Sequence, residues 1–201
     1  MQAEFDIHRS FKELEESCIP SYCHPNIAAA AISWWRLLST SELYRRYGVP
    51  GPILDFGAAS GELYHLLQPN EAYHFVEASE MLSGALKRQL PDARREYLES
   101  LPEAAFETIF ALDSLEHNDN VGAIVDALLP SLRPSGRFFV CGPTESAIYR
   151  LGRRIAGFEG TYHHTTIYDI ERDFAERLDC VVTKRLPPIA PLFRLSVWQR
   201  G

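Results

Sequence analysis

The chain has 201 residues, of which 46% are hydrophobic and 23% are charged, and its formal net charge at pH 7 is −7. A chain of this length can bury roughly two-thirds of the surface of its unfolded state, which is enough for one hydrophobic core without disulfides or metals. The excess of acidic residues argues against nucleic acid as a partner, because nucleic-acid binding usually depends on a basic surface. We therefore expect one soluble domain.

The sequence predicts neither a membrane span nor a secretion signal. No apolar run approaches the roughly 18 residues that a spanning helix needs, and residues 1–6 have neither the basic nor the apolar region of a signal peptide. We therefore expect a cytoplasmic protein. The cysteines lack the paired spacing of a zinc or redox centre, so we expect reduced thiols and no metal site. They are Cys18, Cys23, Cys141 and Cys180.

Residues 1–50 are expected to form a helical segment ahead of the main fold. An apolar helix follows Asn26 and runs to Trp35, and a second helix is expected to start at Ser39, where Ser39 and Glu42 fit a capping box. Gly48 ends the segment. These helices either cover the core or form a lid over a ligand, with Arg36 pairing with a ligand carboxylate.

A strand, a turn and a helix are predicted around residues 53–61, which read Ile-Leu-Asp-Phe-Gly-Ala-Ala-Ser-Gly. Gly57 and Gly61 permit positive φ and remove the Cβ that would keep a ligand away from the backbone. The amides that open the next helix can meet polar ligand atoms. Asp55, at the carboxyl end of the strand, adds an acceptor beside the turn.

A second apolar run, residues 73–76, ends at Glu77, twenty positions after Gly57. This is the offset at which an acid binds ribose hydroxyls in nucleotide-binding α/β units; the alternative is an exposed carboxylate at a strand end. Neither G-x-G-x-x-G nor a phosphate-binding loop is present, so an adenosine-containing ligand without phosphate fits better. Ala59 lies between the two glycines, and an alanine there is tolerated if its φ is negative.

Strands and helices continue to alternate along the rest of the chain. Ser79 is expected to cap a helix that Pro91 stops, and apolar residues at helical spacing predict a helix from Val121 to Leu132. This order, with almost continuously apolar strands, predicts an α/β fold with a parallel sheet covered by helices on both faces. The further strands are expected at 107–112, 137–141, 180–183 and 192–198.

A basic amphipathic helix is predicted after Pro143. Its apolar face would carry Ile148, Leu151, Ile155 and Phe158, and its other faces Arg150, Arg153 and Arg154. Such a helix can lie on a membrane surface or receive an anionic substrate, or it can be a solvated helix that packs on the core. A further helix is expected to follow a cap at Thr166.

Three segments together resemble the class I S-adenosylmethionine-dependent methyltransferases. Residues 53–61 are similar to the first motif, 106–117 to the fourth motif with its Leu-Glu-His turn, and 132–140 to the Leu-x-Pro-Gly-Gly turn. The resemblance covers about residues 50–145. It implies a Rossmann-like three-layer sandwich whose mostly parallel seven-stranded sheet has an antiparallel C-terminal hairpin strand.

The resemblance also implies a division of the single domain 1–201. Residues 1–50 would form the cap or lid and 51–142 the cofactor-binding core, while 143–178 would supply substrate-side helices and 179–201 the closing strands. The cofactor would be S-adenosylmethionine, with S-adenosylhomocysteine as product. Near the adenine edge, either Glu96 or Tyr97 is the contact. The expected cofactor-binding residues are Arg36, Asp55, Gly57, Ala59, Gly61, Glu77, Ala78, Met81, Glu96, Tyr97, Asp113 and Leu115.

The expected reaction moves a methyl group to an oxygen, or to a nitrogen or carbon, of a small molecule that is lipid-like or anionic. His117, His163 and His164 are the candidate bases, because histidine titrates near neutral pH; each could instead be structural. A non-catalytic cofactor-binding module and a nicotinamide-dependent oxidoreductase are the alternatives. The protein would be a monomer or homodimer, without a membrane span but with peripheral membrane contact as an option.

Overall fold

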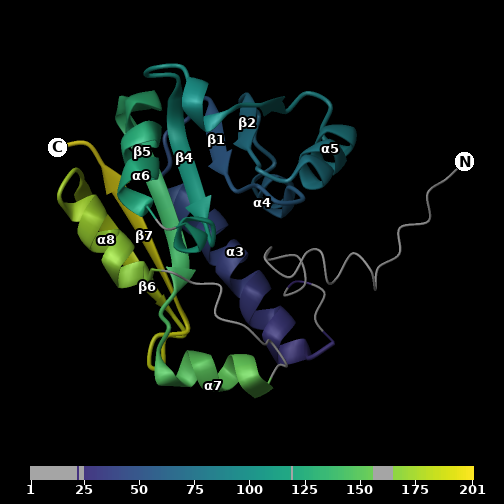
Figure 1. Ribbon diagram of the computed structural model, residues 1–201, viewed down its shortest axis with the longest axis vertical. Coiled ribbons are helices and arrows are strands. Elements are labelled where there is room, and N and C mark those ends of the chain that lie inside the picture. The colour runs from purple at the N-terminus through teal and green to yellow at the C-terminus, as the bar shows by residue number, and fades with distance from the viewer. Residues whose placement is uncertain (1–21, 23–24, 119, 156–164) are drawn as a thin grey trace, which may run out of the picture.

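A computed structural model describes residues 22, 25–118, 120–155 and 165–201. Seven strands form one sheet in the order β3-β2-β1-β4-β5-β7-β6 (Figure 1). The strands are β1 (Ile53–Phe56), β2 (Tyr73–Val76), β3 (Arg94–Arg95), β4 (Phe106–Leu112), β5 (Leu132–Pro143), β6 (Asp179–Leu186) and β7 (Phe193–Gln199).

The direction of the strands confirms the predicted architecture. The five strands from β3 to β5 are parallel, whereas β7 is antiparallel to β5 and β6 is antiparallel to β7. The chain first moves outward from β1 to β3 and then returns to place β4 on the other side of β1. Such a reversal opens a crevice at the carboxyl ends of the strands, where open α/β sheets bind their ligands.

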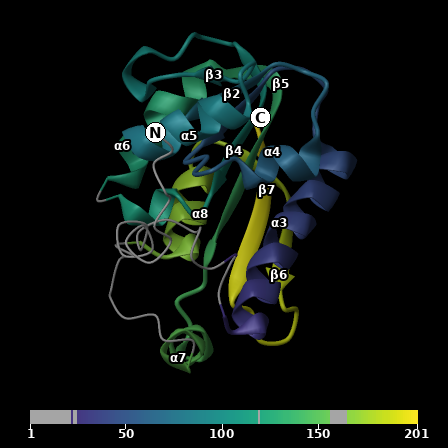
Figure 2. The same ribbon diagram turned by 90° about the vertical axis from the view of Figure 1, so that its right-hand side faces the viewer.

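Helices cover both faces of the sheet and give the three expected layers (Figure 2). On one face, the core joins Phe110 and Phe139 to helices α3, α4 and α5, and on the other Phe138 and Val140 pack against α6 and α8. The helices are α3 (Ile27–Tyr47), α4 (Glu62–Leu67), α5 (Glu80–Gln89), α6 (Val121–Leu128), α7 (Ala147–Ile155) and α8 (Ile167–Ala175).

The expected restart of the N-terminal helix at Ser39 is wrong. Helix α3 continues without interruption from its cap at Asn26, whose side chain accepts from the Ala28 amide, to Gly48. Ser39 and Thr40 are buried in the helix interior, and the Thr40 hydroxyl donates to the carbonyl of Arg36. The Thr40 hydroxyl thus bonds to the preceding turn of the helix and does not cap a new one. The helix therefore continues through the segment that resembles a capping box.

Other predicted boundaries agree more closely with the structure. Ser79 caps α5 through the Leu82 amide, and Thr166 caps α8 through the Asp169 amide. The helix that was expected to reach Leu132 ends instead at Leu128, because a 3₁₀ turn containing Pro130 follows, and Leu132 opens β5. None of the helices in the described part of the chain has the length and apolar character needed to span a bilayer.

Candidate functional site

A cavity of about 930 Å³ lies at the carboxyl ends of β1, β2 and β4, at the point where the strand order reverses. The turns after these strands and the start of α5 supply most of its wall, as expected for this type of sheet. Nine of the predicted site residues line it: Asp55, Gly57, Ala59, Glu77, Ala78, Glu96, Tyr97, Asp113 and His117.

The turn after β1 has the tight geometry that its glycines predicted. Gly57 has a φ of +77°, and a Cβ there would lie 2.4 Å from the Cβ of Ser114. Ala59 does not meet the condition of a negative φ, since its φ is +48°. The Ala59 amide donates to Oε2 of Glu77 at 2.9 Å, and this bond offsets the ~1–2 kcal/mol that a left-handed alanine costs.

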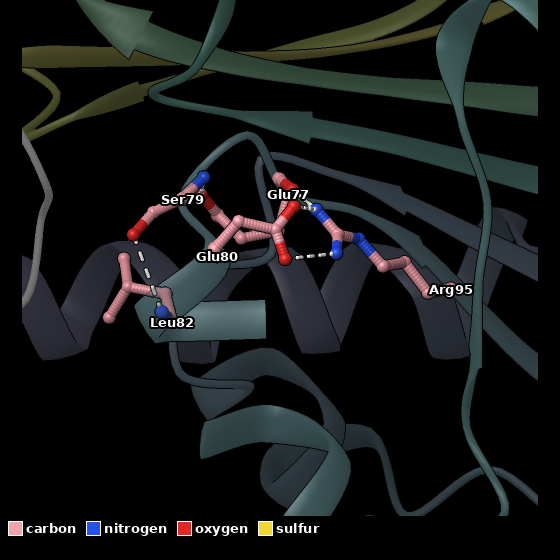
Figure 3. Close-up of polar contacts among 5 residues, drawn as sticks. All are labelled: Glu77, Ser79, Glu80, Leu82 and Arg95. Carbon is pink, nitrogen blue, oxygen red and sulfur yellow. Dashed lines mark hydrogen bonds and ion pairs between the residues drawn. The ribbon is translucent and has the colours of Figure 1, made fainter. Parts of the chain in front are cut away.

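The Glu77 carboxylate joins two turns of the cavity wall. One oxygen accepts from the Ala59 amide, and the other accepts from the Ser79 amide at 2.8 Å. Figure 3 shows Glu77 beside Ser79, where α5 begins. A carboxylate oxygen can accept more than one hydrogen bond, so Glu77 keeps acceptor capacity for the hydroxyls of a ribose.

Arg95 ties β3 to α5 next to this carboxylate. Its guanidinium donates to both oxygens of Glu80, at 2.7 and 2.6 Å, and to the carbonyl of Glu77 (Figure 3). The strand therefore delivers the next two residues, Glu96 and Tyr97, to the cavity wall, and Glu96 also lies 2.7 Å from Nδ1 of His74. Both candidates for the adenine edge thus border the same space.

Asp55 is buried at the base of the cavity and accepts a hydrogen bond from the Tyr73 hydroxyl. Burial raises the pKa of Asp55 to about 7, and the acidic neighbours Glu62 and Glu77 act in the same direction, against the Tyr73 bond. Asp55 therefore keeps its proton to a higher pH than an exposed aspartate does. Sequence reasoning missed Tyr73. The available signal was its position on β2, the strand that pairs in parallel with β1, where Asp55 lies.

An ion pair anchors the end of β4. Nη1 of Arg36 lies 2.6 Å from Oδ2 of Asp113, and both side chains are buried. Asp113 has a φ of +48°. The guanidinium also donates to the Tyr22 hydroxyl and stacks over Phe193, with 4.8 Å to the ring centroid. Arg36 itself does not line the cavity, so it reaches the site through Asp113 and Tyr22, which do.

The turn after β4 carries a buried carboxyl group that sequence reasoning did not assign. Glu116 is 1% exposed, and neither of its carboxyl oxygens has a hydrogen-bond partner in the described part of the chain. Burial, reinforced by Asp113, holds the pKa of Glu116 well above its usual range. Its neighbour His117 lines the cavity.

Other predicted residues lie behind or beside the cavity. Gly61 begins α4 with a φ of +86°, Leu115 is buried, and Met81 is 43% exposed while the adjacent Leu82 lines the wall. Their roles toward a cofactor, like that of Arg36, remain predictions. Among the described residues no group of three His, Cys, Asp or Glu could hold a metal. His163 and His164 lie outside the described residues.

Replacing Asp55 by Asn should stabilise the fold more at pH 8 than at pH 5. The folded-state pKa of Asp55, about 7, exceeds its usual 3.8, so ionisation opposes folding increasingly as pH rises through this window. Thermal and urea unfolding should show a gain about 2 kcal/mol larger at pH 8. The exposed Asp92→Asn is the control, and an equal gain at both pH values would contradict the assignment.

Removing one partner of the Arg36–Asp113 pair should destabilise the protein more than removing both charges. Arg36→Met removes the buried guanidinium beside the Asp113 carboxylate, and breaking such a pair costs about 3–5 kcal/mol. Adding Asp113→Asn should recover much of this loss, because asparagine tolerates the +48° φ. Urea unfolding of both single variants and the double variant measures the coupling; additive losses would exclude a direct pair.

The chain matches the family model described as Methyltransferase domain over residues 36–179. No curated protein sequence matches it. Magnesium protoporphyrin IX methyltransferase from Synechocystis PCC 6803, solved with bound S-adenosylhomocysteine, has a TM-score of 0.71 at 15% identity, covering 98% of this chain and 100% of that one.

N-methyltransferase NodS from Bradyrhizobium japonicum WM9, also with S-adenosylhomocysteine, has a TM-score of 0.72 at 13% identity, covering 96% of this chain and 97% of that one. At these identities the likeness concerns the fold. The carboxylate of Glu77 and the close backbone approach at Gly57 suit a ribose and the rest of such a cofactor. The chain belongs to the methyltransferase domain family and is an S-adenosylmethionine-dependent methyltransferase.

Proposed function

We propose that the protein transfers a methyl group to an oxygen, or less readily to a nitrogen or carbon, of a small and largely neutral acceptor. The main observation in favour of the cofactor site is the position of the Glu77 carboxylate. Two backbone amides hold it where the strand order reverses. The family match favours this activity over a nicotinamide-dependent oxidoreductase and over a non-catalytic binding module.

Methyl transfer requires little acid–base chemistry from the residues that line the cavity. Bound S-adenosylmethionine supplies a methyl group that its sulfonium already activates. The protein has to hold the cofactor, align the acceptor and exclude water. Glu77 would accept the ribose hydroxyls, while the turn at Gly57 and Ala59 would border the methionine end. Asp113, beside the reacting space, is held in place by Arg36.

The charge of the cavity does not favour an anionic acceptor. Several carboxyl groups line it, Glu62, Glu77, Glu96 and Glu99 among them, whereas Arg95 is already paired with Glu80. The arginines that suggested an anionic acceptor, Arg150 and Arg154, are exposed on α7 and lie outside the cavity wall. A neutral, lipid-like acceptor is compatible with this charge.

His117 is the proposed base for an acceptor that carries a proton at neutral pH. It is the candidate histidine that lines the cavity among the described residues, and it follows β4 directly after the buried Glu116. His163 and His164 remain candidates from the sequence. We also propose that residues 143–178 form the acceptor side of a single domain that spans 1–201.

Titration calorimetry tests the cofactor site before an acceptor is known. The protein should bind S-adenosylmethionine and S-adenosylhomocysteine but not NADH. Glu77→Gln should weaken binding at least about tenfold, because hydrogen bonds to a charged group contribute about 1.5–3 kcal/mol. Glu103→Gln is the matched control, since Glu103 is exposed and does not line the cavity, and should change affinity by less than about threefold. Unchanged affinity of Glu77→Gln would refute the ribose assignment.

A transfer assay with methyl-labelled cofactor tests the acceptor class and the base. Panels of phenols, fatty acids, amines and extracted lipids should give labelled product with the neutral, amphiphilic compounds. His117→Gln should lower turnover about 10²–10⁴-fold on a protonated acceptor while cofactor affinity stays unchanged. His65→Gln, on the exposed surface of α4, is the control. Full turnover of His117→Gln would remove His117 as the base.

A further inference from the structure

Three segments meet at one end of the molecule, beyond the carboxyl ends of the parallel strands. Helix α7 starts four residues after β5 ends, and Pro143 at the end of β5 pairs with Phe193 at the start of β7. The connection 187–192 between β6 and β7 therefore lies at this end too. Both views also place the first turn of α3 here (Figures 1 and 2). We call the segments 27–30, 147–155 and 187–192 the apolar end.

Large apolar side chains on this end are unusually exposed. Ile27 is 83% exposed, Ile148 55%, Leu151 58% and Ile189 98%. Ile148 and Leu151 are three residues apart, so they share one face of α7. The opposite face holds α7 to the protein through Tyr149, whose ring centroid lies 5.6 Å from that of Phe193. Clustered exposed apolar residues mark interaction surfaces.

The same end is locally basic in an acidic protein. Residues 143–155 contain three arginines and a single acid, Glu145, whereas 27–35 and 186–193 contain no charged residue. Arg150 and Arg154 are exposed beside the apolar face of α7. Arg150 donates to the backbone carbonyl of Glu145, which leaves its positive charge uncompensated by that contact. An apolar face flanked by arginines is complementary to a surface of anionic lipids.

We propose that the apolar end docks on an anionic lipid membrane. Ile148, Leu151 and Ile189 enter the headgroup region, and Arg150 and Arg154 bind lipid phosphates. A second copy of the chain is a poorer occupant, because two such ends would bring their arginines together. The docking is independent of methyl transfer.

If the protein docks through the apolar end, the position of the cavity determines how an acceptor reaches it. The cavity opens at the carboxyl ends of β1, β2 and β4, and the apolar end lies beyond the carboxyl end of β5, which runs parallel to β4. If the proposed methyl transfer is correct, an amphiphilic acceptor reaches the cavity from the lipid surface. That part of the inference rests on the proposed function.

Co-sedimentation of the full chain with vesicles tests the docking. The probes are vesicles of phosphatidylcholine alone and of phosphatidylcholine mixed with phosphatidylglycerol. Ile148→Ser/Leu151→Ser should weaken binding to the anionic vesicles about tenfold or more, and Arg150→Gln/Arg154→Gln should weaken it about 30-fold. The matched control is Arg45→Gln/Arg88→Gln, which removes two exposed arginines elsewhere and should change binding less than about threefold.

Each outcome decides one claim. Binding to anionic vesicles alone, lost in both α7 variants and kept in the control, supports the docking. No binding, equal binding of all variants, or a dimer that disappears in Ile148→Ser/Leu151→Ser overturns it. Circular dichroism and urea unfolding report whether every variant is folded, and calorimetry with S-adenosylmethionine reports cofactor binding. Vesicle binding without cofactor binding would refute the proposed function alone, and cofactor binding without vesicle binding would refute the docking alone.

Discussion

The shape of the cavity wall depends on one carboxylate that connects two turns of the backbone. Glu77 accepts from the amides of Ala59 and Ser79, and so joins the turn after β1 to the start of α5. Without this hydrogen bond, nothing would offset the energetic cost of the positive φ of Ala59. The same carboxylate is the group that we propose binds the ribose. A single side chain therefore shapes this part of the wall, and the strand order brings the two turns together.

Burial tunes the charge of the site. Asp55 and Glu116 both have raised pKa values because they are removed from water near other acids. Asp113 differs, since Arg36 compensates its charge directly. Burial therefore makes Asp55 and Glu116 harder to ionise, whereas a guanidinium compensates the charge of Asp113.

Residue types and their spacing predicted much of the fold and several of the residues that line the cavity. Residue types and their spacing identified the turn around Gly57 and the acid at Glu77, and the alternation of strands and helices identified the sheet. The failures involve long-range contacts. The conformation of Ala59 depends on Glu77, the continuity of α3 through Ser39 depends on burial, and the partner of Arg36 is 77 positions away at Asp113. No local window contains those partners, so the sequence pattern could not report them.

The stacking of Arg36 over Phe193 changes how the N-terminal helix should be regarded. Through one guanidinium, α3 contacts the end of β4 at Asp113 and the start of β7, so it touches both halves of the sheet. It is therefore not a separable cap on a complete core. If this helix were grafted onto a related protein, Arg36 would bring a buried positive charge that needs an acid at the end of β4. If the helix were removed from this protein, Asp113 would lose its guanidinium partner unless it were also replaced. Arg36 and Asp113 are therefore expected to change together, although more than a third of the chain separates them.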